Sequence, residues 1–476
     1  MLYENNSAKV GAILLIRKYM QNIKLSMSLK LFIIGFLIVI LMIPIGMIAF
    51  LTNERESRQD EAFGEVRGKW GNEQTITGPI LSIPYKDKVE RATSNGTVVD
   101  EVVRYAHFLP EELNIKGKID PEKRKRGIYE VVVYNTDLEI SGRFLAPDFS
   151  KWDIAKDDIL YKQAFVTLGI PDTRGIKEAL DLEWENKKYA FTPGVKASDV
   201  VTLGVNADID LSQNNNAGQN FKIVLSLNGS RDLDFAPLGR STQVELSSVW
   251  PDPSFQGAFL PESRTVNDAG FTAVWKVLEI NRNFPQKFLG SLGAVDQVMP
   301  SGINKEMSGI SSAGIVNQSN FGVRLLVSAS EYQETVRALK YAIMLLALTF
   351  LVLFFYEAMR GVRVHPLQYI LIGLALALFY LLLLSISEYL GFKTAYLLSA
   401  LTIITLITLY SKSVFKAWRP AFLEALILVF VYGFIFVILQ LEDYSLLVGS
   451  LGLLVILTVV MFISRKIDWY SVGQKE

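Results

Sequence analysis

Residues 365–388 read HPLQYILIGLALALFYLLLLSISE, and this stretch decides what kind of protein the chain is. Between residues 367 and 387 it carries no charged side chain, and its length matches the roughly 20 apolar residues that cross a bilayer core as a helix. A His-Pro pair preceded by Arg360 and Arg363 opens the stretch, and the acidic Glu388 closes it. Because Lys and Arg accumulate in cytoplasmic loops, this asymmetry predicts a transmembrane helix that enters from the cytoplasmic side.

The composition indicates a membrane protein with a large soluble part. Half of the residues are hydrophobic (50%), yet 48 Lys and Arg balance 48 Asp and Glu, so the charges must be concentrated outside the spans. The balanced charge gives no indication of nucleic-acid binding. Because the chain has no cysteine, a disulfide framework and a thiolate metal site are both excluded.

The chain begins with residues 1–30, which we expect to be cytoplasmic and to lie beside the inner surface of the membrane with their basic side chains. An apolar run follows at residues 31–51. The run is longer than the roughly 7 to 15 apolar residues of a signal peptide, and it lacks a small-residue cleavage site. It therefore predicts an uncleaved first transmembrane helix, and the charged residues 54–69 are compatible with a continuation of that helix beyond the membrane.

Residues 52–338 have the composition of a soluble domain, in which short strand-like runs alternate with turn residues. The runs lie at residues 75–85, 102–109, 127–144, 163–170, 221–227, 242–249, 270–280 and 322–328. They predict a large β-rich, sandwich-like and antiparallel domain. Its length exceeds that of a typical single domain, so the sequence leaves open one unit or two sandwich-like lobes.

The rest of the chain is predicted to be a five-helix transmembrane bundle at residues 339–466, followed by a tail at residues 467–476. The apolar blocks are residues 341–356, 367–387, 394–410, 421–441 and 445–464. With the first span, they predict an integral membrane α-helical protein with six transmembrane helices, one N-terminal and five C-terminal.

The charges of the short loops predict the topology. Basic residues gather in three alternate loops: Arg360 and Arg363; Lys412, Lys416 and Arg419; Arg465 and Lys466. The remaining short loops carry Glu388 and Lys393, then the acidic Glu442 and Asp443. Four basic residues near outer span ends count against the pattern, but they border a long domain, and long segments translocate largely regardless of charge: Arg55, Arg58, Arg337 and Lys340. The positive-inside rule then puts both termini in the cytoplasm and the β-rich domain in the periplasm.

The candidate functional residues are the polar side chains at the span ends and within the third span: Glu357, Arg360, Arg363, His365, Gln368, Tyr380 and Glu388. Carboxylates near the membrane are functional candidates by default, but Glu357, Glu388 and Glu424 are close enough to an interface to be solvated or paired. The two histidines of the chain, His107 and His365, are predicted on opposite sides of the membrane, so a His-rich metal site is not expected. We expect His107 to be a buried structural residue and His365 to begin its helix.

Enzyme signatures are mostly absent from the sequence. It contains no G-x-x-x-x-G-K-[ST] phosphate loop, no H-E-x-x-H and no G-x-S-x-G. One S-x-x-K match, at residues 413–416, falls in a predicted cytoplasmic loop without its companion motifs, and we interpret it as chance. We therefore predict no catalytic residue, metal site or cofactor.

Several motifs are specific enough to indicate a family. The β-rich part contains GPILSIPY (78–85), RKRGIYEVVVY (124–134), LNGSRDLDFAPLG (227–239), SVWPDPSFQGAFLP (248–261) and GFTAVWKV (270–277). The membrane part contains KYAIMLLALTFLVLFFYE (340–357), the stretch at 365–388 and RKIDWY (465–470). In this order and spacing, nearly the whole chain after Lys30 resembles the CreD family, bacterial inner-membrane proteins described as involved in cell-envelope integrity.

The resemblance implies an inner-membrane protein linked to envelope stress, including responses to β-lactams and altered colicin tolerance. It supplies no reaction, ligand or catalytic residue. Two hypotheses stay open. In the first, a non-enzymatic protein binds an envelope protein, a glycan or a lipid through its periplasmic domain, while the helices anchor it in the lipid bilayer. In the second, an ion-coupled or partner-dependent transporter or lipid-handling protein has a pathway lined by residues 357, 365, 368, 380 and 388.

Overall fold

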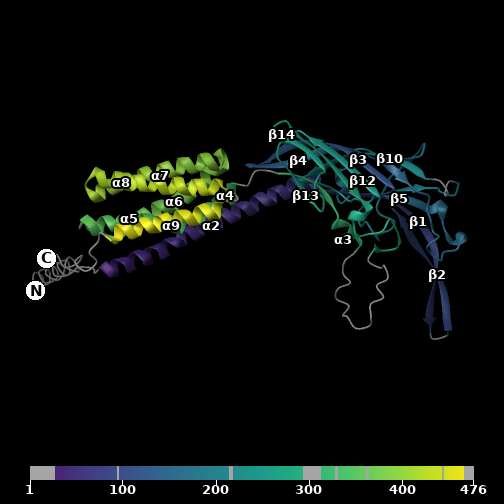
Figure 1. Cartoon of the computed structure of the whole chain (residues 1–476), viewed down its shortest axis with the longest axis horizontal. Coiled ribbons are helices and arrows are strands. Elements are labelled where there is room, and N and C mark those ends of the chain that lie inside the picture. Colours follow the sequence, from purple (N-terminus) through teal and green to yellow (C-terminus); the bar gives the residue numbers. More distant parts are fainter. Residues whose placement is uncertain are drawn as a thin grey trace, which may run out of the picture. The chain divides into compact units, whose positions relative to one another are not determined.

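The computed structural model describes residues 27–93, 96–213, 218–292, 312–326, 331–360, 364–441 and 444–465 (Figure 1). Residues 60–328 form one compact unit, here called the β-rich unit. The described residues before and after them form a second, here called the helical unit. Most of the predicted N-terminal segment (residues 1–26) and the predicted tail (residues 467–476) lie outside the described residues, as do Arg363, Glu442, Asp443 and Lys466.

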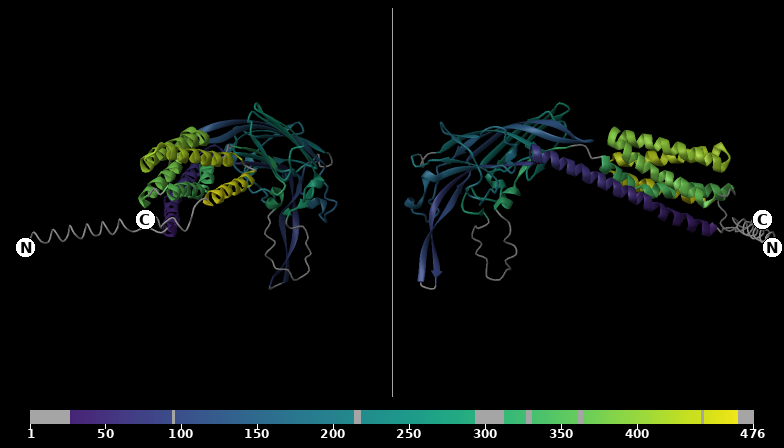
Figure 2. Two further views of the ribbon diagram at one scale, coloured as in Figure 1. Left: turned by 60° about the vertical axis from the view of Figure 1, so that its left-hand side comes forward. Right: turned by 180° about the vertical axis from the view of Figure 1, so that it is seen from behind.

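Six helices in the described part of the chain are long and apolar enough to cross a membrane, which confirms the predicted number and order of spans. They are α2 (Met27–Trp70), α5 (Ala342–Arg360), α6 (Pro366–Leu390), α7 (Phe392–Phe415), α8 (Trp418–Gln440) and α9 (Ser445–Ser464). Figure 2 shows α5 to α9 from two further sides.

Helix α2 is a single helix of 44 residues, so the charged stretch after the apolar run does continue it. At 1.5 Å per residue it is about 66 Å long, roughly twice the thickness of a bilayer core. One face of its apolar part is buried in the helical core through Ile34, Leu37, Leu41, Ile45 and Ile48. This spacing of three and four residues is that of one helix face.

The uncharged stretch at residues 367–387 lies within α6, and both ends of this helix have a local cause. His365 caps the N-terminus, with Pro366 in the first turn, where a missing N–H costs nothing. Gly391 follows the last turn with a φ of 72°, a conformation that glycine adopts without strain. Within the helix, Gly373 lets α2 approach closely, because a Cβ there would lie 2.1 Å from Leu41 Cδ1.

A short helix, α4 (Glu331–Leu339), precedes α5 and is absent from the sequence-based prediction. Residues up to 338 were expected in the β-rich domain, whereas α4 belongs to the helical unit. The reason is its amphipathic pattern: Tyr332, Thr335, Ala338 and Leu339 are buried on one side, and the helix packs on α6.

Two sheets make up the described part of the β-rich unit. The first contains β13 (Pro253–Gly257), β17 (Phe321–Leu325), β11 (Asp232–Phe235), β1 (Gln74–Thr93), β5 (Ala164–Gly169), β9 (Gly204–Ile209) and β8 (Thr192–Pro193), in that order, with β2 (Gly96–Phe108) on β1 and β16 (Lys287–Leu289) on β2. The second contains, in order, β14 (Ser263–Asn267), β15 (Gly270–Leu278), β12 (Ser241–Ser248), β3 (Glu112–Arg126), β4 (Tyr129–Phe144), β10 (Gln219–Ser230), β6 (Asp181–Trp184) and β7 (Lys187–Ala190). Short helices complete the unit: η1 (Lys156–Asp158), η2 (Tyr161–Gln163), η3 (Thr173–Gly175), η4 (Glu279–Asn281) and α3 (Ser312–Asn317).

The sheets are mostly but not entirely antiparallel, which corrects the expectation of an antiparallel domain. Strand β1 pairs in parallel with β11, and β12 pairs in parallel with β3. Parallel neighbours need a long connection, and both pairs join strands that are more than a hundred residues apart in the sequence. Local alternation of apolar residues cannot reveal such a pairing.

Both sheets bury side chains in one hydrophobic core. Along β10 buried residues alternate with more exposed ones, the period expected of a strand with one covered face. The largest fully buried side chains of the unit include Trp275 and Tyr134 from the second sheet and Phe235 and Phe321 from the first. Beyond Tyr85, β1 pairs only with β2, and this two-stranded ribbon extends from the unit (Figures 1 and 2).

Candidate functional site

The first candidate, Glu357, lies in a polar cluster at the end of the spans where α6 begins. The Lys30 ammonium of α2 pairs with Glu357 Oε1. The backbone N–H of Val364 donates to the same oxygen at 3.2 Å, and the Tyr369 hydroxyl donates to Oε2 at 3.4 Å. Glu357 is only 6% exposed, so these partners offset the cost of burying its charge. The sequence left open whether this carboxylate is solvated or paired near Arg360 and Arg363; the described partner is Lys30.

His365 and Gln368 form a reciprocal cap at the start of α6. The N–H of Leu367 donates to His365 Nδ1 at 3.2 Å, and the N–H of His365 donates to Gln368 Oε1 at 3.0 Å. Both bonds satisfy N–H groups that a helix start leaves without partners. Arg360 ends α5, but its side chain, like the whole of Arg363, lies outside what the structure describes.

Tyr380 lies in the packed core of the helical unit, away from both ends of α6. It is buried, and its ring contacts Phe379 with 4.8 Å between ring centroids. His365 and Glu388 are separated by about 35 Å along the helix axis. The candidate residues on α6 therefore occupy three separate levels and do not converge on one site.

Glu388 lies in a second polar cluster, at the other end of α6. The Tyr332 hydroxyl of α4 donates to Glu388 Oε1 at 2.9 Å. Arg55 Nη1 of α2 lies 3.9 Å from the same oxygen, and the Glu388 side chain is 10% exposed. A carboxylate is unfavourable at a helix C-terminus, and these two partners offset that cost.

Glu424, on α8, differs from the other two carboxylates. It is 2% exposed, and neither of its oxygens has a hydrogen-bond partner among the described residues. The expectation that all three carboxylates are solvated or paired is therefore wrong for Glu424. A helix position near a predicted interface was the only guide in the sequence, and it does not reveal whether neighbouring helices cover the side chain.

In the β-rich unit, His107 is buried as predicted. Its Nδ1 lies 2.8 Å from Ser82 Oγ, and its Nε2 lies 3.2 Å from Asp199 Oδ2. Its ring packs against Phe288, with 5.1 Å between ring centroids. Among the described residues, no group of three or more His, Asp or Glu could hold a metal ion.

Asp234, on β11, is a carboxylate that the sequence patterns did not single out. Gln256 Nε2 donates to its two carboxylate oxygens at 3.2 and 3.3 Å. The nearby Arg324 instead binds both oxygens of Asp232, at 2.7 and 2.8 Å. Burial, supported by the charges of Asp232 and Glu73, raises the pKa of Asp234 to about 6. A carboxyl that titrates near neutral pH is a recognised mark of a functional site.

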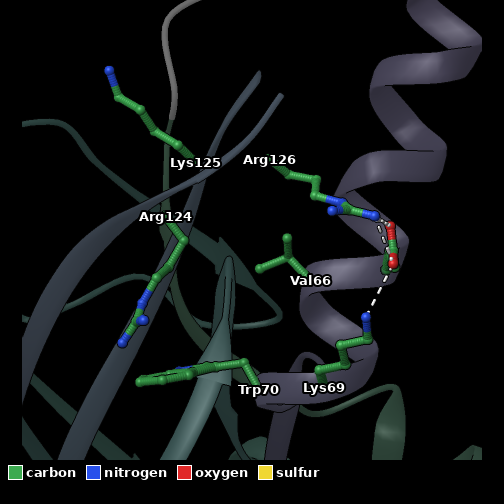
Figure 3. Close-up of a pocket in the computed structure, with 7 residues that line it drawn as sticks. Val66, Lys69, Trp70, Arg124, Lys125 and Arg126 are labelled. Atoms are coloured by element: carbon green, nitrogen blue, oxygen red, sulfur yellow. Dashed lines mark hydrogen bonds and ion pairs between the residues drawn. The ribbon is translucent and has the colours of Figure 1, made fainter. Parts of the chain in front are cut away.

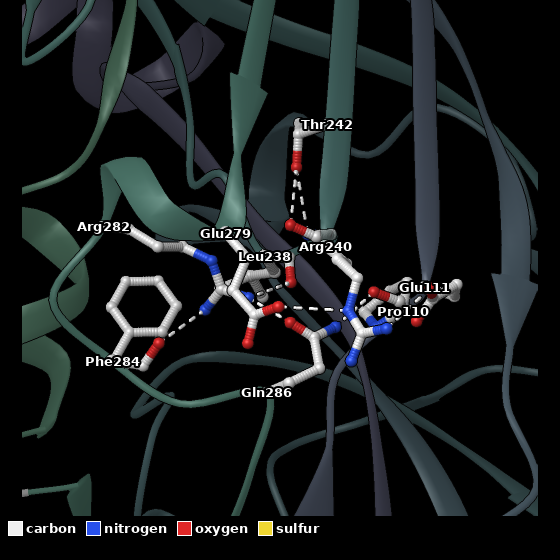
Figure 4. A network of polar contacts seen from close by, with 10 residues as sticks. Pro110, Glu111, Leu238, Arg240, Thr242, Glu279, Arg282, Phe284 and Gln286 are labelled. Carbon is white, nitrogen blue, oxygen red and sulfur yellow. Dashed lines mark hydrogen bonds and ion pairs between the residues drawn. The ribbon is translucent and has the colours of Figure 1, made fainter.

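A second buried charge of this unit is Arg282, which is 7% exposed (Figure 4). Its guanidinium donates to the carbonyls of Phe284 and Leu238, at 3.1 and 3.2 Å, and to the side chain of Gln286. Burial lowers the pKa of Arg282 to about 10. Since its partners are mainly carbonyls that hold loops together, we interpret Arg282 as a structural residue.

One cleft among the described residues of the β-rich unit has a volume of about 440 Å³. Its walls are Thr75 and Thr77 of β1, the loops at residues 169–171 and 200–203, and Val316, Asn317 and Asn320. None of these residues is charged. The side-chain oxygen of Asn320 is buried and has no hydrogen-bond partner among the described residues. The cleft therefore offers apolar contact and a few uncharged polar side chains to an uncharged ligand.

Another cleft, of about 220 Å³, lies between the end of α2 and the end of β3 (Figure 3). The Arg124 guanidinium stacks on the Trp70 ring at 4.3 Å from its centroid. Arg126 binds Glu65 through two hydrogen bonds of 2.9 and 3.0 Å. Because its charges are already paired or stacked, this cleft is the weaker candidate for a binding site.

Comparisons with known proteins agree with the resemblance in the motifs. The family described as "Inner membrane protein CreD" matches residues 26–470. The inner membrane protein CreD of Escherichia coli (strain K12) is 32% identical over 437 residues, which cover 91% of this chain and 92% of that protein. A solved structure of an M1 zinc metallopeptidase from Deinococcus radiodurans matches 38% of this chain and 42% of that chain, with 8% identity and a TM-score of 0.18. A similarity this weak carries no argument.

Proposed function

Because the chain belongs to the CreD family of inner membrane proteins, we propose that it supports the integrity of the cell envelope and the response to envelope stress, including β-lactams. In this proposal the β-rich unit acts by binding an envelope component, and not by catalysis. A fold alone does not define a function, so the proposal depends on the cleft in that unit.

We further propose that both termini are cytoplasmic and that the β-rich unit is periplasmic. The basic loops of the sequence support this orientation through the positive-inside rule. The lipid bilayer is then the partner of the spans. Helix α9, which has no buried residue, would present its apolar side chains to lipid.

The observation that carries the binding proposal is the uncharged cleft of about 440 Å³. Ligand sites are typically concave and largely apolar, with a few polar groups that fix orientation. Thr75, Thr77 and Asn320 are such groups, and the described lining residues carry no charge that would favour a phosphate or carboxylate ligand. We propose an uncharged portion of an envelope protein, glycan or lipid as the ligand.

Photocrosslinking in intact cells tests this proposal. A photoreactive amino acid replaces Thr202, which is exposed at the cleft, and in a matched control it replaces Lys188, which is exposed on β7 and does not line the cleft. We expect one envelope component to be recovered from the Thr202 position only. Asn320→Leu should reduce that yield by about three- to tenfold, the effect of one lost hydrogen bond. Equal recovery from both positions would contradict the assignment of the cleft.

A strain that lacks the gene tests the envelope role. The sensitivity of this strain to detergent and β-lactams should change, and expression of the full chain should restore the original level of sensitivity. We expect that the β-rich unit secreted alone does not restore it, because the spans contribute. Full rescue by the β-rich unit would show that the membrane part is only an anchor.

The alternative function is ion-coupled or partner-dependent transport or lipid handling. The observation that favours it is the pair of buried carboxylates among the spans, Glu357 and Glu424. Charged residues within spans are costly and often mark ion or substrate pathways. Reconstitution of the purified chain in liposomes, with an imposed ion gradient, separates this function from simple binding.

A further inference from the structure

Glu424 is the least satisfied polar group that the structure describes within the spans. It lies near the start of α8, is 2% exposed, and has no hydrogen bond to either carboxylate oxygen among the described residues. An ionised carboxylate at such a buried position is unfavourable, because no described side chain supplies it with a counter-charge. An ionised Glu424 therefore lacks a counter-charge among the described residues.

A second, independent observation comes from the neighbouring helix. Ser411, on α7, is fully buried, and its hydroxyl oxygen also lacks a hydrogen-bond partner among the described residues. Ser411 is the side chain that lies beside Glu424. A serine hydroxyl can accept a hydrogen bond from a protonated carboxyl. Ser411 can donate to an ionised Glu424, but only a protonated Glu424 can donate in return, so an added proton keeps the contact between the two helices and removes the uncompensated charge.

The surrounding charges leave Glu424 without a counter-ion. On α5, Glu357 is already paired with Lys30 of α2. On α6, the Tyr369 hydroxyl donates to Glu357. The basic residues at the same end of α7, α8 and α9 are the half-buried Lys412, which stacks over the Trp418 ring at 3.9 Å, and the exposed Lys416, Arg419 and Arg465. None of these four is paired with Glu424 in the described structure.

We propose that Glu424 and Ser411 form a proton-binding site within the spans, at the end where α6 begins. One carboxyl oxygen carries the proton, and this O–H group donates a hydrogen bond to Ser411 Oγ. Loss of the proton to the solution at that end leaves an uncompensated charge between α7 and α8. Protonation of this one side chain thereby controls how these two helices pack. The site needs neither the cleft of the β-rich unit nor its ligand, so it stands apart from the proposed envelope function.

A hydrophobic carbodiimide, dicyclohexylcarbodiimide, tests the site on the purified full chain in detergent micelles. This reagent reacts with protonated carboxyls: the proton moves to one nitrogen, the carboxyl oxygen bonds to the central carbon, and an acyl shift gives a stable N-acylurea without a leaving group. Mass spectrometry should find the adduct on Glu424 and not on the ion-paired Glu357. Between about pH 5 and pH 9, labelling should fall about tenfold per pH unit once the carboxyl loses its proton.

Substitutions and a change of cation distinguish a bound proton from a bound metal ion. Glu424→Gln should abolish the adduct, while Ser411→Ala should retain it and shift the pH at which labelling is half-maximal. Replacement of choline by Na⁺ at equal ionic strength should change nothing; specific protection by Na⁺ would overturn the proton assignment in favour of a sodium site. The absence of a Glu424 adduct in the wild-type chain at every pH would also overturn the proposal. If the Glu424→Gln variant does not accumulate, the pH dependence of labelling in the wild-type chain still shows whether Glu424 binds a proton.

Discussion

Asp234→Asn should make the stability of the β-rich unit less dependent on pH. In the folded chain the pKa of Asp234 is raised from 3.8 to about 6, chiefly by burial. The folded state therefore holds the proton more tightly than the unfolded state does. The bound proton therefore stabilises the folded state. This contribution to the free energy of unfolding is complete below about pH 3.8 and is lost as pH rises to about 6. At 1.36 kcal/mol per pH unit, the loss is up to ~3 kcal/mol.

Asparagine keeps the shape of the side chain and an oxygen that can accept from Gln256, but it does not titrate. At pH 7 the variant should therefore exceed the wild type in free energy of unfolding by up to ~3 kcal/mol. Near pH 4 the two proteins should be about equally stable. All other titrating groups are shared, so the difference between the two proteins isolates Asp234.

The assay is urea unfolding of residues 60–328, followed by tryptophan fluorescence at several pH values. Asp232→Asn is the matched control, because it breaks the two-bond ion pair with Arg324 and should destabilise the unit at pH 7. A difference between Asp234→Asn and the wild type that stays constant from pH 4 to pH 7 would refute the reasoning. So would a variant that is less stable than the wild type at pH 7.

Three further predictions concern topology, folding and the ends of the spans. Single cysteines placed at Asn228 and Lys412 should be labelled from the periplasm and from the cytoplasm respectively, and periplasmic labelling at Lys412 would contradict the topology. The isolated residues 60–328 should be soluble with a β-dominated circular dichroism spectrum, since they have their own core; a mainly helical spectrum would exclude this. Tyr332→Phe should lower the thermal stability of the full chain by about 1 kcal/mol, the worth of its hydrogen bond to Glu388. Glu388→Gln keeps an acceptor for the Tyr332 hydroxyl, so it should lower the thermal stability by less than Tyr332→Phe does. A larger loss in Glu388→Gln would show that the ion pair with Arg55 contributes most of the stability at this cluster.

Local sequence patterns were sufficient to predict the class of the protein, the six spans and most of the longer strands. An apolar run of about 20 residues has few alternatives to a membrane helix, because a bilayer requires internal backbone hydrogen bonding. Alternation along residues 221–227 predicted β10 for a similarly local reason. The strand β3 was not predicted, because its outer half, DPEKRKR, is charged and contains a proline. Its inner half alternates in burial, but that half is short.

The tertiary structure alone decided which polar residues are satisfied and which are not. Glu357, Glu388 and Glu424 look alike in the sequence, each a single carboxylate near the end of an apolar run. Lys30 lies 327 positions from Glu357 in the chain, and Tyr332 and Arg55 reach Glu388 from two other helices. No comparable partner reaches Glu424 among the described residues. Hydrogen bonds and burial depend on distances of a few ångströms between segments far apart in the chain, and a pattern of neighbouring residues does not encode those distances.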